Sequence, residues 1–425
     1  MDNVRKLLRS KVAQNGMWLL ILQMFNMVVP LLTLPYITRI LSTSDYGKFS
    51  IALNWIGYLQ VIVEFGFGLT GARKVAATDS KEQLSKIHCS IIYARFLLAV
   101  FCATILAVIC IMSPVEKSQI VCMLILFLMV VAVIFQQTWF FQGISEMRNI
   151  TVINMISRAI SVALIFLLVR RESDLYLYCF LYVSNFLIAS LFGMIVVHKK
   201  YKVKFCYISF KCVIEEIKDG WYLFISSAMS KIFSSIGITV LGFVAISSEV
   251  GIYSAINKIP YIMTILFASV SQALYPHMCK QFTVSFDNGL KQVRRIAKLV
   301  MMPFIIVGII FILLNKPIVL IAFGSEYAKK STLLIPFVIW VLFSILNNFL
   351  GVQTLVASES QKEYSQSFQI STVIMLVLMF LLGRVWGSYG VAGASMLSEM
   401  ILTVLLLINI SVKIKKENKN VQETD

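Results

Sequence analysis

Charged residues are scarce in this 425-residue sequence, since Asp, Glu, Lys and Arg make up 14% of it and hydrophobic residues make up 59%. Soluble globular chains carry about 25% charge. This shortage of charged residues excludes a soluble domain. It also argues against a β-barrel, because barrel strands alternate apolar and polar residues, whereas here apolar residues run on for about 20 positions at a time.

Residues that bind metals or form disulfides are equally few. The three histidines, His88, His198 and His277, stand far apart and have no Cys, Asp or Glu at ligand spacing, so we expect no metal site. The eight cysteines lie in or near hydrophobic segments, which does not favour a disulfide framework. The sequence also lacks the loop G-x-x-x-x-G-K-[ST], so we expect neither ATP hydrolysis nor a bound cofactor.

What the sequence does contain is a series of apolar segments long enough to cross a bilayer. Only helices satisfy all backbone hydrogen bonds within such segments, so the fold class is an all-α integral membrane protein. We predict about twelve transmembrane helices. Their expected extents are 14–38, 48–71, 86–112, 118–143, 149–169, 175–197, 219–245, 251–277, 297–322, 331–357, 364–386 and 389–412.

The net charge of +17 follows the topology of these helices. With the N-terminus inside, the inner segments hold about 25 Lys and Arg and the outer segments about 9, as the positive-inside rule expects. This asymmetry places both termini and the loop 198–218 in the cytoplasm. It also explains the basic excess without a nucleic-acid partner, and we expect none.

Two short matches at one offset indicate an internal repeat. The segment 15–21 aligns with 219–225, and Asp45-Tyr-Gly-Lys-Phe-Ser50 aligns with Glu249-Val-Gly-Ile-Tyr-Ser254. Each match begins a predicted helix, so we expect two six-helix bundles in the same orientation. The predicted domains are an N-terminal bundle at 1–197, a cytoplasmic linker at 198–218, and a C-terminal bundle with a basic cytoplasmic tail at 219–425.

Several short stretches together carry a family resemblance over nearly the whole chain. They are Tyr222-Leu-Phe-Ile-Ser-Ser227, Glu249–Ala255 and Tyr275-Pro-His277, with Pro35-Tyr36, Asp45–Gly47, Phe65-Gly66, Gly71–Arg73, Trp139–Gly143 and Phe323–Tyr327. In this order, they resemble the Wzx-type O-antigen and polysaccharide flippases, the polysaccharide transporter family within the MATE-like MOP superfamily. One departure is that Gly237-Ile238 stand where family members often carry an acidic-basic pair, so no role of that pair transfers to this chain.

The resemblance implies a MATE-like fold, a location in the cytoplasmic (inner) membrane, and a function. The substrate would be an undecaprenyl-diphosphate-linked oligosaccharide, an O-antigen or related surface polysaccharide repeat unit, moved from the inner to the outer leaflet by alternating access. The implied partners are membrane lipids, a polysaccharide polymerase and a chain-length regulator. The chain itself would not be an enzyme and would have no catalytic residues.

Two other functions remain open. A multidrug or cation exporter of the same superfamily would need an acidic lumen, whereas the charges inside these predicted helices are mainly basic. A membrane glycan polymerase usually needs a sizeable external loop for catalytic residues, and the longest outer loop here, around 315–330, is short.

Six charged residues lie deep within the predicted helices, away from their ends. At depth each costs roughly 2.5 to 3.5 kcal/mol to insert, so it should face protein or a water-filled cavity. The cations lie on polar helix faces, and we expect them to line one lumen that attracts a diphosphate, with ion pairing or helix packing as the alternative. The two acids are candidates for coupling to H⁺ or Na⁺. The residues are Arg95, Arg158, Lys231 and Lys258, with Glu64 and Glu399.

Overall fold

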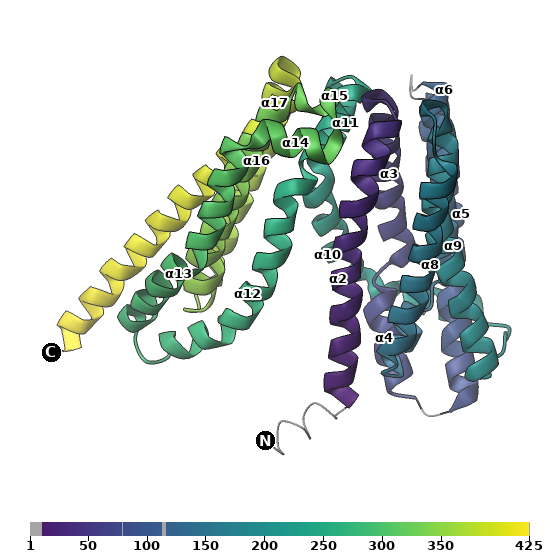
Figure 1. Ribbon diagram of the computed structural model, residues 1–425. Coiled ribbons are helices and arrows are strands. Elements are labelled where there is room, and N and C mark those ends of the chain that lie inside the picture. Colours follow the sequence, from purple (N-terminus) through teal and green to yellow (C-terminus); the bar gives the residue numbers. More distant parts are fainter. Residues whose placement is uncertain (1–10, 79, 113–115, 425) are drawn as a thin grey trace. The chain divides into compact units, whose positions relative to one another are not determined.

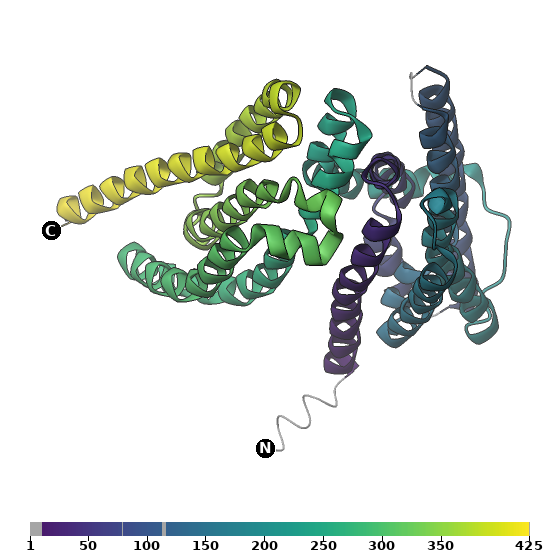
Figure 2. The same cartoon turned by 45° about the horizontal axis from the view of Figure 1, so that its top comes forward.

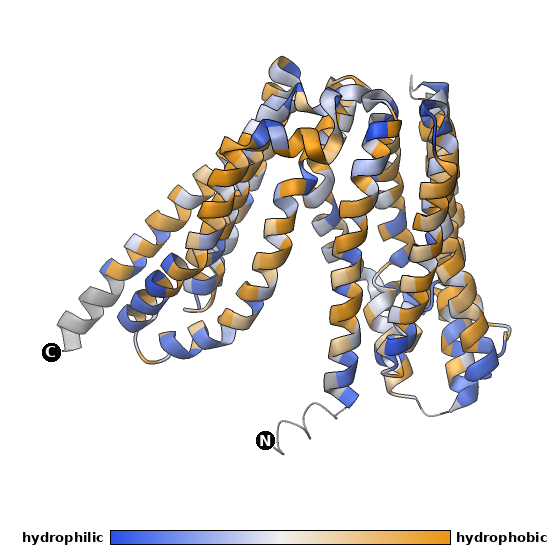
Figure 3. Cartoon of the chain, in the orientation of Figure 1, coloured by the Kyte–Doolittle hydropathy of each residue, from blue (hydrophilic) through white to orange (hydrophobic). Residues whose placement is uncertain are grey.

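The computed structural model describes residues 11–78, 80–112 and 116–424, and the side chains of 12, 13, 112 and 416–424 are left aside. The described residues are almost all helical, with no strand among them (Figure 1). The long helices are mostly hydrophobic along their middles and hydrophilic toward their ends (Figure 3). The helices are α2 (Lys11–Ile40), α3 (Thr43–Glu64), α4 (Phe67–Ala76), α5 (Lys81–Met112), α6 (Lys117–Phe135), α7 (Thr138–Gly143), α8 (Met147–Leu168), α9 (Leu175–Lys200), α10 (Phe210–Val244), α11 (Ser247–Ile256), α12 (Lys258–Phe282), α13 (Phe286–Leu313), α14 (Asn315–Phe323), α15 (Ser325–Ala328), α16 (Leu334–Leu350) and α17 (Gln361–Thr424).

The helices confirm the predicted fold class. In the described part of the chain, eleven helical stretches are long and apolar enough to cross a membrane. The last of these contains two arms, because Gly387 has φ 54° and ψ −129° and reverses the chain. Ser371 Oγ donates to Ser398 O at 2.7 Å and Asn409 Nδ2 donates to Ser367 Oγ at 2.8 Å, so the arms run antiparallel, as Figure 2 also shows. Counting the arms separately gives the twelve expected spans.

The chain forms two compact units that divide between Thr239 and Val240, inside α10. In the N-terminal unit α3 packs on α6, α6 on α9, α9 on α8, and α8 on α2. In the C-terminal unit α16 packs against α12, α13 and α17. The predicted domain limits at 197 and 219 stay predictions.

Segment 201–209, within the predicted linker, packs against the N-terminal unit. Lys204 N donates to Ser85 Oγ at 3.1 Å, and Cys206 N donates to Cys89 Sγ at 3.2 Å, both on α5. Val203 and Val213 are buried in the hydrophobic core of that unit. The segment therefore has a fixed place beside α5.

Two helical stretches of the N-terminal unit, α3–α4 and α6–α7, are each interrupted toward their C-terminal end. Between α3 and α4 the chain turns at Phe65 (φ 43°) and Gly66 (φ 77°), where glycine adopts the left-handed conformation without strain. Between α6 and α7 it runs through Gln136 and Gln137. The short helices α4 and α7 then pack together, and buried aromatic rings of both, Phe67, Trp139 and Phe140, form the core there.

The C-terminal unit has its own irregular segment. After α16 the chain forms a π-helix, η3 (Gly351–Val356), which packs on α17 because Gly351 leaves room for the ring of Tyr364. Single turns of π-helix occur frequently at functional sites. Prolines do not end the helices in which they lie: α2 continues through Pro30 and Pro35, and α12 through Pro276.

Candidate functional site

Arg95 lies on α5 and is 3% exposed. Its Nη1 donates to Val133 O and Gln136 O, both at 2.9 Å. Both carbonyls lie at the C-terminal end of α6, where Val133 O also accepts a hydrogen bond from Gln136 N at 3.2 Å. The guanidinium thus ties α5 to the break between α6 and α7.

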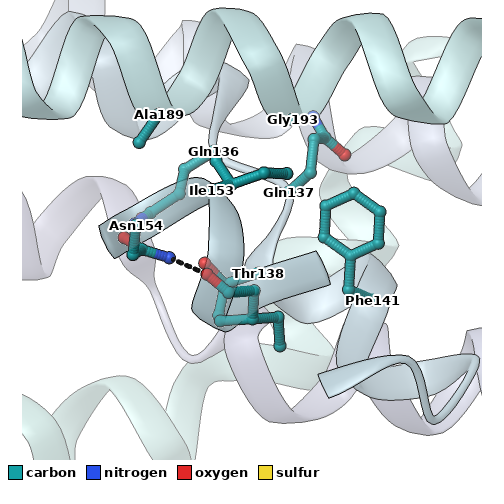
Figure 4. Close-up of a pocket in the computed structure, with 9 residues that line it drawn as sticks. Gln136, Gln137, Thr138, Phe141, Ile153, Asn154, Ala189 and Gly193 are labelled. Carbon is teal, nitrogen blue, oxygen red and sulfur yellow. Dashed lines mark hydrogen bonds between the residues drawn. The ribbon is translucent and has the colours of Figure 1, made fainter. Parts of the chain in front are cut away.

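The break beside Arg95 encloses only a small cavity, shown in Figure 4. Gln136, Gln137, Thr138 and Asn154 line it, and Asn154 Nδ2 donates to its own helix at Ile150 O, 2.8 Å away. The cavity measures about 10 Å³, which is close to the space that one water molecule needs. It is too small for a sugar or a phosphate.

Arg158 lies half-buried on α8, and its Nη1 donates to Asn26 Oδ1 of α2 at 2.5 Å. Two neighbours on the same helical face have other partners: Ser161 Oγ donates to Leu181 O of α9 at 2.6 Å, and Asn154 lines the small cavity. Thr151, two turns earlier, donates through Oγ1 to Trp18 O of α2 at 2.8 Å. Arg158 and Thr151 therefore both connect α8 to α2.

Lys231 and Glu64 lie in one charged group of the N-terminal unit. The Lys231 side chain occupies the space beside Gly57, since a Cβ built there would lie 2.7 Å from its Cε and Nζ, and its ammonium lies 5.9 Å from the ring centre of Tyr58. Glu64 accepts a hydrogen bond from Gln60 Nε2 at 3.2 Å and is acted on by the charges of Arg95 and Lys231. We call Glu64, Arg95 and Lys231 the charged cluster.

Lys258 is the first residue of α12, in the C-terminal unit, and its side chain is exposed. Its ammonium lies 6.0 Å from the ring centre of Tyr261, at the limit of a cation–π contact. The structure therefore brings three of the six predicted site residues together in the charged cluster, and describes Arg158 and Lys258 in other surroundings.

Glu399, on the second arm of α17, is half-buried and has neutral partners in the described residues. Asn347 Nδ2 of α16 donates to its Oε2 at 2.6 Å, and Ser344 also forms a hydrogen bond with it. Thr403 Oγ1 donates to Asn347 Oδ1 at 2.7 Å, which fixes the orientation of that amide. Glu399 is thus held by hydrogen bonds alone.

Next to Glu399 lies a larger cavity that the sequence did not reveal. It measures about 280 Å³ and opens between α12 and α16. Ser344, which contacts Glu399, is part of its wall. The available signal was the pair Asn347-Asn348 in the middle of an apolar helix. The polar residues of the wall are Thr264, Ser271, Gln272, Ser344 and Asn348.

No group of three or more His, Cys, Asp or Glu in the part of the chain that the structure describes could hold a metal ion. His88 and His198 do meet, with ring centres 5.5 Å apart, and both also pack on aromatic rings, among them Trp139 and Phe205. His198 Nδ1 lies 2.6 Å from Val203 O. The candidate site therefore consists of charged and polar side chains on helices.

Two solved structures share this fold over most of the chain. The structure titled "Lipid II flippase MurJ, inward closed conformation" has a TM-score of 0.72 at 16% identity, covering 92% of this chain and 87% of that one. An inward-facing multidrug resistance MATE family transporter of the MOP superfamily has a TM-score of 0.64 at 12% identity, covering 92% and 99%. At such identities the likeness shows the fold, which is MATE-like as expected.

Two curated proteins align with nearly the full chain. Both carry the name "Putative O-antigen transporter": one from Escherichia coli (strain K12) is 26% identical and covers 94% of this chain and 97% of its own length. One from Shigella dysenteriae is 24% identical and covers 90% and 96%. The family described as "Polysaccharide biosynthesis protein" matches residues 12–282, more than half of the sequence. This chain therefore belongs to the polysaccharide biosynthesis protein family.

Proposed function

We propose that this protein is a flippase that moves an undecaprenyl-diphosphate-linked oligosaccharide across the cytoplasmic membrane by alternating access. The supporting observation is the charged cluster, which places two cations and one acid among apolar helices of the N-terminal unit. Charges at that depth are expensive and usually mark a substrate or ion pathway. The family, the names of the two curated relatives and the fold shared with a lipid II flippase support the same function.

The cations have different roles in this proposal. Lys231, Arg158 and Lys258 attract the diphosphate, Lys as a point charge and Arg through two parallel hydrogen bonds. Arg95 is buried and donates to the carbonyls of Val133 and Gln136, so it stabilises the α6–α7 break. Its positive charge also compensates the negative charge of Glu64. Both termini and segment 198–218 face the cytoplasm, and a polymerase and a chain-length regulator act on the delivered product.

The competing functions fit the described site less well. A cation exporter would need mainly acidic side chains along its substrate path, whereas the charged cluster has two cations for one acid. A glycan polymerase would need reactive groups beside a sugar-sized space, and the larger cavity between α12 and α16 is lined by hydroxyl and amide groups. The proposed role is therefore transport without catalysis.

Replacing Lys231 or Arg158 by alanine is expected to lower surface polysaccharide at least about tenfold while leaving the protein in the membrane, because a charge-assisted contact with a phosphate is worth about 1.5 to 3 kcal/mol. Arg158→Lys should restore only part of the loss, since lysine cannot make the paired contact. The measurement is complementation of a deletion strain, scoring surface polysaccharide and membrane protein level together.

The matched control is Lys86→Ala, which removes a cation whose partner is Glu82 on the same exposed face of α5, at 3.0 Å. Such surface pairs contribute little, so polysaccharide should stay at the wild-type level. Normal polysaccharide from both the Lys231 and the Arg158 alanine variants, at normal protein level, would refute the proposed phosphate contacts.

We further propose that Glu64 or Glu399 couples transport to a gradient of H⁺ or Na⁺. Glu399 is the stronger candidate, because its described partners Asn347 and Ser344 are neutral and leave a negative charge to be balanced by a bound cation or a proton. Glu399→Gln should remove the dependence of transport on the gradient in proteoliposomes, with little loss of folded protein because the amide keeps the hydrogen-bonding shape. Gradient dependence that persisted in both Glu→Gln variants would exclude this coupling.

A further inference from the structure

The cavity between α12 and α16 is lined by neutral polar and apolar side chains. Its polar groups are hydroxyls and amides, its apolar residues are Phe267, Ala268 and Ile345, and none of its lining residues carries a charge. An ion would favour charged groups in the wall, and a drug-like molecule would favour a mostly aromatic or aliphatic one. A neutral ligand that is rich in hydroxyl groups suits this wall best.

The hydrogen bonds around the cavity show which groups remain available to such a ligand. Asn348 Oδ1 accepts from Ser271 Oγ at 2.8 Å, so the amide presents its two N–H groups as donors. Thr264 Oγ1 donates to Tyr261 O at 2.7 Å, and the Ser344 hydroxyl is used by Glu399, so both present oxygen lone pairs as acceptors. Donors and acceptors on one wall match hydroxyl groups, which both donate and accept.

We propose that this cavity binds a sugar ring of the lipid-linked oligosaccharide. This inference rests on the proposed function and adds to it the part of the substrate that the C-terminal unit recognises. A volume of about 280 Å³ lies just below the range of drug-sized pockets, which begins at about 300 Å³, so it suits a single ring.

The position of Lys258 agrees with this assignment. Lys258, Tyr261, Ala268 and Gln272 follow the spacing of one helical face, and the last two line the cavity. At 1.5 Å per residue Lys258 and Ala268 are about 15 Å apart along α12. One face of α12 therefore offers a cation for the diphosphate and, further along, a neutral pocket for sugar.

The test uses purified full-length protein and measures how strongly two lipids raise its thermal stability. One is the lipid-linked oligosaccharide extracted from a host strain that cannot polymerise it, and the other is undecaprenyl diphosphate without sugar. The sugar-bearing lipid should stabilise the wild type at about tenfold lower concentration, since sugar contacts add to the binding.

The variant Ala268→Trp fills the cavity from an exposed position and removes no hydrogen bond of the protein. The matched control is Ala273→Trp, an exposed position on the same helix outside the wall. Asn348→Asp is a second variant, which keeps the acceptor for Ser271 and removes the two N–H donors. Ala268→Trp and Asn348→Asp should bind both lipids equally, whereas Ala273→Trp should behave as the wild type.

The outcomes separate the two proposals. A preference for the sugar-bearing lipid that persisted in Asn348→Asp and in folded Ala268→Trp would overturn the sugar pocket and leave the flippase proposal standing. If neither lipid stabilised the wild type, the proposed function would fail, and the sugar pocket with it.

Discussion

Arg95→Ala is expected to remove most of the protein from the membrane, an outcome different from a folded but inactive flippase. The change removes the guanidinium donor from the carbonyls of Val133 and Gln136, although Val133 O keeps its bond from Gln136 N, and it leaves the charge of Glu64 less compensated. Removing one partner of a buried ionic group costs about 3 to 5 kcal/mol, a large part of the stability of a typical domain. The measurement is the amount of full-length protein in the membrane fraction, beside the polysaccharide that it supports.

The double variant Arg95→Ala with Glu64→Gln serves as the internal control. It removes the uncompensated acid together with the cation, so protein abundance should recover in part, although the bonds from Arg95 to Val133 O and Gln136 O stay lost. Normal abundance of Arg95→Ala combined with loss of polysaccharide would show instead that Arg95 contacts substrate, as the sequence alone led us to expect.

Gly220→Ala should disrupt the N-terminal unit. A Cβ built at Gly220 would lie 2.4 Å from the backbone oxygen of Phe65, so α10 would have to move away from the turn between α3 and α4. That movement would also weaken the stacking of Phe65 on Phe224, whose ring centres lie 4.5 Å apart. Overpacking of this kind costs about 1 to 3 kcal/mol, and here the opposing atom is backbone, so we expect the upper end. Thermal unfolding of the purified variant measures the loss.

Gly68→Ala is the matched control for this change. Gly68 is exposed on α4, two residues after the same turn, and a Cβ there would meet no atom within 4 Å. Alanine is favoured over glycine in a helix by up to about 1 kcal/mol, so this variant should be as stable as the wild type or slightly more stable. Equal stability of the Gly220 and Gly68 variants would show that α10 does not need close contact with the turn.

The spanning helices were predictable from sequence because their signal is local. Runs of about 20 apolar residues fix both the helical state and the length. The resemblance to polysaccharide flippases was confirmed at the level of the family, because its short stretches are spread over the matched region 12–282 and beyond it. The reversal at Gly387 also lies between two of the predicted helices, at 386 and 389.

The positions where helices break, and the partners of the charged side chains inside them, could not be predicted in the same way. The helices break at Phe65-Gly66 and Gln136-Gln137, where packing of α4 against α7 compensates for the lost backbone hydrogen bonds, while α2 continues through its prolines. Helical spacing placed Arg158 on a polar face, but only the fold shows that Asn26 is its partner. The roles of the six ionisable residues stay predictions, which the variants above test.

The place of α10 has a consequence for how the protein is made. Although α10 opens the predicted second repeat of the sequence, its residues as far as Thr239 belong to the N-terminal unit. Lys74 pairs with Glu216 and Asp219, both at 2.8 Å, and Asn54 donates to Thr239 at 2.8 Å. A ribosome that has released residues 1–197 has therefore not yet supplied all of that unit. A gene cut between the repeats would divide one folding unit, and its first product would leave the membrane-insertion machinery with the turn at Phe65 and Gly66 uncovered.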